Sequence, residues 1–141
     1  MAFYIKLYFT TLLAFFAIDM VWLGLIARTF YHTQLDFLLR PDTNWLAAIL
    51  FYLLFILGIL VFVVLPGLAE DSLKRTILRG ALFGLVTYAT YDLTNLATVK
   101  DWPLLVTIVD LAWGTVLSIA VSCAGFLAGK RLGWKSMAAH P

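Results

Sequence analysis

The sequence predicts an all-α, polytopic membrane protein, a bundle of four transmembrane helices in a single domain over residues 1–141. Of its residues 63% are hydrophobic and only 13% are charged, with a mean hydropathy of +0.96. A soluble domain of this length needs far more charge to cover its surface. Apolar runs fall at about 4–27, 45–69, 76–98 and 102–128. Each is long enough, at about 1.5 Å per residue, to cross about 30 Å of hydrocarbon.

The first run is expected to stay in the protein as a helix. Its apolar stretch is too long for a cleaved signal peptide, and no small-x-small cleavage site appears before Arg28. The connection that follows, residues 28–44, is the longest in the chain. Its apolar residues favour a short amphipathic helix in the outer interface, with an ordered loop as the alternative: Phe30, Tyr31, Leu35, Leu38 and Leu39.

Pro41 is expected to end that segment, and Asp42, Thr43 or Asn44 can cap the second spanning helix. The remaining connections are short. Trp45 and Trp102 begin the second and fourth helices, and Trp134 follows the last one. Tryptophans at these places are typical of the aromatic belts at the two membrane interfaces.

The distribution of Lys and Arg predicts that both termini are cytoplasmic, because cytoplasmic loops carry the excess of basic residues. One side of the predicted bundle collects seven of them: Lys6, Lys74, Arg75, Arg79, Lys130, Arg131 and Lys135. The other side holds Arg28, Arg40 and Lys100. A net charge of +2 without a basic run argues against nucleic acid. The single cysteine, Cys123, excludes an intrachain disulfide and a cysteine-based metal site.

Three predicted helices each carry one aspartate: Asp19, Asp92 and Asp110. Counted from the outer ends of the predicted helices, all three lie about 9–12 Å below the outer boundary, in one layer. An aspartate near the centre of a spanning helix costs roughly 2.5–3.5 kcal/mol on insertion scales. The three side chains should therefore face each other, a partner or a water-filled cavity. Because no Lys or Arg shares the layer, shared protons or a bound cation are expected there.

Rows of residues at i, i+4 spacing predict how the third and fourth helices pair. The rows are Gly80, Gly84, Tyr88 and Asp92 on the third helix, and Asp110, Gly114, Ser118 and Ser122 on the fourth. Aligning the acids of these antiparallel helices sets Tyr88 against Gly114, Gly84 against Ser118 and Gly80 against Ser122. Small residues allow helices to approach closely in lipid. The third helix is polar on several faces, and we expect neighbouring helices or water to surround it.

Other polar and aromatic residues lie one turn from the aspartates, which completes a predicted binding site. Its members are Asp19, Trp22, Tyr88, Asp92, Asn95, Asp110 and Trp113. A structural role is the alternative, since membrane helices use buried polar groups as glue and tryptophans for packing. Asp19-x-x-Trp22 and Asp110-x-x-Trp113 look alike. Their helices run in opposite directions, which predicts tryptophans at different depths.

Four segments resemble a bacterial membrane family known as domain of unknown function 2177. They are DMVWLGLIARTFY, LLRPDTNWLAAILFYLLF, GALFGLVTYATYDLTNLATVKDWP and VDLAWGT, and the resemblance covers about residues 4–128. It implies a four-helix protein of the bacterial inner membrane. It also places Asp19, Asp92, Asn95, Asp110 and Trp113 in the characteristic segments of the family. It implies no reaction and no cofactor.

Three functions are compatible with these residues. The first is proton-linked transport or binding of a cation or hydrophobic amine, since carboxylates exchange protons and aromatic faces attract organic cations. A homodimer is then expected, because four helices alone enclose little volume. The second is a membrane-embedded enzyme acting on a lipid or isoprenoid, with aspartates as acid and base, or as metal ligands together with Asn95. The third is a structural partner in a membrane complex.

Overall fold

A computed structural model describes residues 1–39 and 41–134, so Arg40 and Lys135, which entered the count of basic residues, lie outside the described part. Within that part every regular element is a helix, which confirms the all-α fold class. The elements are α1 (Ala2–Val21), η1 (Trp22–Ala27), α2 (Arg28–Leu35), α3 (Trp45–Ile59), η2 (Leu60–Val64), α4 (Leu65–Ala69), α5 (Leu73–Thr98) and α6 (Leu104–Arg131). Two of them, η1 and η2, are π-helical.

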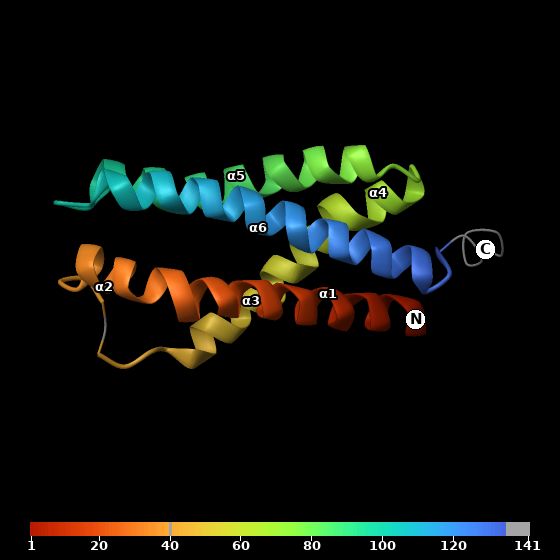
Figure 1. Ribbon diagram of the computed structural model, residues 1–141, viewed down its shortest axis with the longest axis horizontal. Helices are drawn as coiled ribbons and strands as arrows, with labels where there is room; N and C mark the ends of the chain where they lie inside the picture. The colour runs from red at the N-terminus through yellow and green to blue at the C-terminus, as the bar shows by residue number, and fades with distance from the viewer. Residues whose placement is uncertain (40, 135–141) are drawn as a thin grey trace.

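The first helix does not end near residue 27 as predicted. It continues through the π-helical η1 into α2 without a break, and α2 extends the direction of α1 (Figure 1). The predicted short helix of the first connection therefore exists, but as the last part of a continuous helix. No proline or capping residue stops the helix before Leu35. A buried row at i, i+4 spacing runs along it: Phe3, Leu7, Thr11, Phe15, Asp19, Ala27 and Leu35.

The second long helix is built from α3, η2 and α4 and has the predicted bounds, residues 45–69. Asn44 caps it, because its side chain accepts a hydrogen bond of 3.1 Å from the backbone N–H of Ala47. Ser72 caps α5 in the same way, accepting from the N–H of Arg75. The turn between α4 and α5 is tight, and Asp71 in it has a φ of 49°.

Within the described residues, three helical segments are long and apolar enough to cross a membrane: Ala2–Leu25, Trp45–Ala69 and Leu104–Arg131. The fourth, α5, has 26 residues, enough for about 39 Å, but its basic residues and threonines lower its hydropathy. It lies along α6 for much of its length (Figure 1). A fourth span remains a prediction.

Neighbouring helices or water were predicted around α5, and the water remains a prediction. Neighbouring helices do not surround it, because its buried residues are only Thr76, Gly80, Gly84 and Asp92. The reason lies in its threonines. The hydroxyl groups of Thr90 and Thr98 each donate a hydrogen bond to a backbone carbonyl four residues earlier, at 2.7 Å. A threonine satisfied by its own helix needs no polar neighbour and can face lipid.

The N-terminus and the end of α6 lie at one end of the bundle, called the terminal end below. The rings of Phe3 and Trp134 have centroids 5.6 Å apart there. Figure 1 shows the start of α1 beside the last turns of α6, at the same end of the bundle as the α4–α5 turn. The core runs between the helices from this end and is apolar, with Leu7, Phe15, Ile56 and Leu117 among its most buried members.

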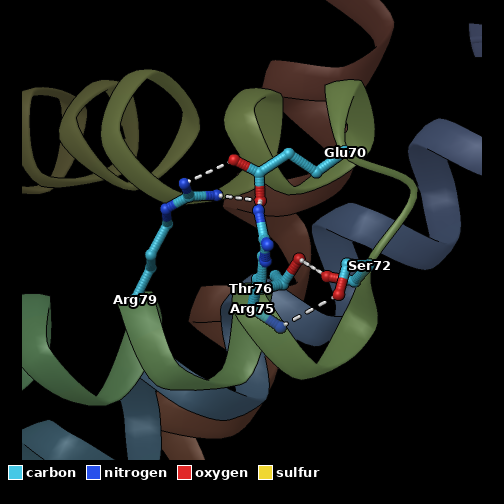
Figure 2. A network of polar contacts seen from close by, with 5 residues as sticks. All are labelled: Glu70, Ser72, Arg75, Thr76 and Arg79. Carbon is cyan, nitrogen blue, oxygen red and sulfur yellow. Dashed lines mark hydrogen bonds and ion pairs between the residues drawn. The ribbon is translucent and has the colours of Figure 1, made fainter.

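Glu70, in the α4–α5 turn, forms ion pairs with two arginines of α5 (Figure 2). Arg79 binds it in bidentate fashion, at 2.7 and 3.1 Å, and Arg75 lies 3.0 Å away. These two cations lower the pKa of Glu70 from 4.5 to about 2. Because the pKa is lower in the folded protein, the stabilisation is complete above about pH 4.5 and is lost as the pH falls toward 2.

We therefore expect Glu70→Gln to lower the thermal unfolding temperature in detergent at pH 7, and the difference from the unmodified protein to shrink between pH 4.5 and 3. Asp42→Asn, which removes an exposed carboxyl group outside the network, is the control and should change little at either pH. A difference that persists unchanged at pH 3 would show that the ion pairs do not hold this turn.

Candidate functional site

The register predicted for α5 and α6 is confirmed. A β-carbon placed on Gly84 would lie 2.3 Å from the carbonyl oxygen of Gly114 and 2.7 Å from the Cβ of Ser118. One on Gly114 would lie 2.1 Å from the ring of Tyr88, and one on Gly80 would lie 3.1 Å from the Oγ of Ser122. The two helices thus touch through small residues, and at Gly84 the backbone of α6 leaves no room for a side chain.

This register brings Asp92 and Asp110 to one level of the bundle. Both are buried, and their carboxyl groups are close enough to interact electrostatically. Asp92 is fully buried, and neither of its carboxyl oxygens has a hydrogen-bond partner among the described residues. A buried polar group without a partner is rare in folded proteins. This pair is the part of the predicted acidic layer that the structure reproduces.

Asp19 does not share that level, so the prediction of three carboxylates in one layer is wrong for it. Thr11 of α1 packs on Gly125 of α6. Counting along both antiparallel helices from this contact puts Asp19 level with Leu117, about two turns or about 10 Å nearer the terminal end than Asp110. The depth of Asp19 was predicted by counting residues from a helix end at residue 27. Because the helix continues to Leu35, that depth was wrong.

Trp22 and Trp113 lie at the same depth, which corrects the prediction of different depths. Their rings are stacked, with centroids 4.3 Å apart and an interplanar angle of 9°. Trp22 lies one turn beyond Asp19 and Trp113 one turn before Asp110 along the bundle. Because the two aspartates are offset, the tryptophans meet between them. Trp113 and Asp19 also line the same cavity.

Two adjoining cavities flank these residues. The first, of about 200 Å³, contains Asp19 and both tryptophans, together with Tyr31, Tyr52 and Tyr88 among its lining residues. The second, of about 320 Å³, is lined by Phe51, Phe55, Thr87, Tyr88, Tyr91 and Asp110. Phe51 and Tyr88 line both. Tyr88 interacts electrostatically with all three aspartates. Side chains on a helix lean toward the N-terminus of that helix. The N-terminus of α5 is at the terminal end of the bundle, so Tyr88 leans toward Asp19, which lies nearer that end than Asp110 does.

The structure adds Tyr31 and Tyr52, which the sequence reasoning missed. The hydroxyl group of Tyr31 donates a hydrogen bond to the Asp110 carboxylate, joining α2 to α6. Tyr31 lies on the same i, i+4 row as Asp19, so extending that row beyond residue 27 would have identified it. Tyr52 gives no such signal, because the helix around it is apolar on every side.

Five of the seven predicted site residues line the cavities: Asp19, Trp22, Tyr88, Asp110 and Trp113. Asp92 lies beside them, between α5 and α6. Asn95 is half-buried and is not among the described residues that line either cavity.

Among the described residues, no three His, Cys, Asp or Glu side chains come together in an arrangement that could hold a metal ion. The depth of Asp19 explains why the three aspartates do not form such a group. Asp19, Asp92 and Asp110 also take part in none of the ion pairs between described residues. The site therefore combines carboxyl groups with aromatic rings and hydroxyl groups.

No curated protein and no solved structure matches this sequence. A family model does, and it is described as a predicted membrane protein, domain of unknown function 2177. The match covers residues 4–127, which include every helix that lines the two cavities. The chain therefore belongs to this membrane protein family.

Proposed function

We propose that the protein binds a hydrophobic organic cation, such as a protonated long-chain amine, and carries it in exchange for protons. The observation that supports this most directly is that Asp19 and Asp110 each line a cavity with aromatic walls, while no ion pair with a described basic residue neutralises them. Carboxylates attract a cation, and aromatic faces stabilise it further once water is excluded.

The size and position of the second cavity favour an organic ligand that arrives from the bilayer. Its volume of about 320 Å³ lies at the lower end of the range for small-molecule sites. Two of its lining residues, Phe51 and Tyr91, are 49% and 59% exposed, so the cavity opens on the side of the bundle. In a membrane that side faces lipid, and a hydrophobic amine dissolved there can reach Asp110 without crossing water.

Asp92 supplies the proton-exchange part of the proposal. Its carboxyl group interacts electrostatically with that of Asp110 and has no hydrogen-bond partner among the described residues. Two neighbouring buried carboxyl groups favour keeping a proton between them. A cation bound at Asp110 takes the place of that proton, so binding and proton release become coupled. The setting we propose is a bacterial inner membrane with both termini cytoplasmic.

Equilibrium binding of radiolabelled tetraphenylphosphonium to the protein in lipid nanodiscs tests this function. We expect saturable binding with release of about one proton into a weakly buffered solution, and Asp110→Asn should weaken binding at least tenfold, because the cation loses its counter-charge. Asp36→Asn, at the exposed end of α2, is the matched control and should bind like the unmodified protein. Equal binding by both variants would reject the proposal, and full biological activity of all three aspartate variants would favour a structural role.

A further inference from the structure

The outer surface of the bundle is hollowed at the terminal end, between α1 and α6. A groove of about 400 Å³ is lined there by Thr10, Ala124, Leu127, Ala128, Arg131 and Leu132. Thr10, Ala124 and Ala128 have short side chains, which leaves a furrow between the two helices. The helices α1 and α6 run side by side there (Figure 1). Leu127 and Leu132, 51% and 38% exposed, form its apolar rim.

The open end of the furrow is basic. Arg131 lines it, and Lys6 lies one turn before Thr10, whose hydroxyl group donates a 2.8 Å hydrogen bond to the Lys6 carbonyl oxygen. The contacts of Phe3 with Trp134 and of Thr11 with Gly125 put Lys6 level with Arg131 on the neighbouring helix. Both are exposed, and no ion pair between described residues uses either of them. Lys130, by contrast, is paired with Asp71.

We propose that this furrow binds one anionic phospholipid, with the phosphate between Lys6 and Arg131 and an acyl chain along Ala124 and Ala128. A guanidinium group binds a phosphate in bidentate geometry, and an ammonium group adds a point charge. A methylene chain fits a narrow apolar furrow that begins at the charged level and runs toward the middle of the bundle. The basic pair thus gives selectivity for lipid charge, and the furrow gives selectivity for lipid over a soluble anion. This inference is independent of the proposed transport.

Native mass spectrometry of the detergent-solubilised protein, titrated with dioleoylphosphatidylglycerol or dioleoylphosphatidylcholine, tests the site. We expect one tightly retained phosphatidylglycerol per chain, weaker retention of phosphatidylcholine, and no competition from inorganic phosphate at equal concentration. Lys6→Gln with Arg131→Gln should weaken phosphatidylglycerol about 25-fold, since each basic residue near an anionic membrane surface contributes about fivefold. The matched control is Arg28→Gln with Lys100→Gln at the opposite end of the bundle, which should retain the lipid.

Ala124→Leu separates the furrow from simple charge attraction, because it fills the groove and keeps both basic residues. We expect it to weaken phosphatidylglycerol binding severalfold while the circular dichroism spectrum and the thermal unfolding temperature stay unchanged, which shows that the variant is folded. Equal retention of the two lipids, displacement by inorganic phosphate, or full retention by Ala124→Leu would each overturn the proposed lipid site.

Discussion

Replacing Gly84 by alanine is expected to destabilise the bundle by roughly 1–3 kcal/mol or more, the range for an overpacked site. The added β-carbon would lie 2.3 Å from the backbone carbonyl oxygen of Gly114, and a backbone atom cannot move aside as the end of a side chain can. We therefore expect α5 and α6 to separate. The separation would loosen the packing of Tyr88 on Gly114 and move Asp92 away from Asp110. The measurement is unfolding of the purified protein in mixed micelles, followed by circular dichroism.

Gly24→Ala is the matched control, because a β-carbon on Gly24 would meet no atom within 4 Å. Glycine inside a helix is less favourable than alanine by about 0.5–1 kcal/mol, so this variant should be as stable as the unmodified protein or slightly more stable. If the Gly84 and Gly24 variants unfold alike, the close α5–α6 contact described here is wrong.

Asp92→Asn is expected to change stability and function in opposite directions. Both carboxyl oxygens of Asp92 are buried without a partner, and an unsatisfied buried polar group costs about 1–3 kcal/mol, more when it is charged. Asparagine is neutral, so it removes both the penalty of burying a charge and the repulsion by the Asp110 carboxyl group. We therefore expect a fold more stable by about 1 kcal/mol, together with loss of the proton release that accompanies tetraphenylphosphonium binding.

This combination separates a functional carboxyl group from a structural one, since residues kept for activity often lower stability. The two quantities are measured on one preparation, by micelle unfolding and by a pH-indicator dye during ligand addition. Asp36→Asn should leave both unchanged, because its side chain is exposed. Lower stability with normal proton release in the Asp92 variant would instead identify Asp92 as a packing residue that holds α5 to α6.

The sequence determined those features that depend on local composition and spacing. Long apolar runs are helices in a membrane because backbone polar groups there must be paired within the segment. Length and hydropathy identify three such segments among the described residues: Ala2–Leu25, Trp45–Ala69 and Leu104–Arg131. The α5–α6 register also follows from the sequence. Setting Asp92 level with Asp110 aligns the rows of glycine, serine and tyrosine at i, i+4 spacing, and the contacts of Gly80, Gly84 and Gly114 confirm that alignment.

Only the tertiary structure decided the relative depth of α1 and the membership of the site. The first helix carries no local signal of its end, since the π-helical η1 continues it through Arg28 to Leu35. Depth counted from an assumed end therefore placed Asp19 too near Asp110. Because of that error, the sequence did not predict the stacking of Trp22 on Trp113 or the hydrogen bond from Tyr31 to Asp110. Both contacts join residues about 80 to 90 positions apart, and spacing along one helix cannot predict how far it slides against another, because side-chain packing between the helices sets that distance.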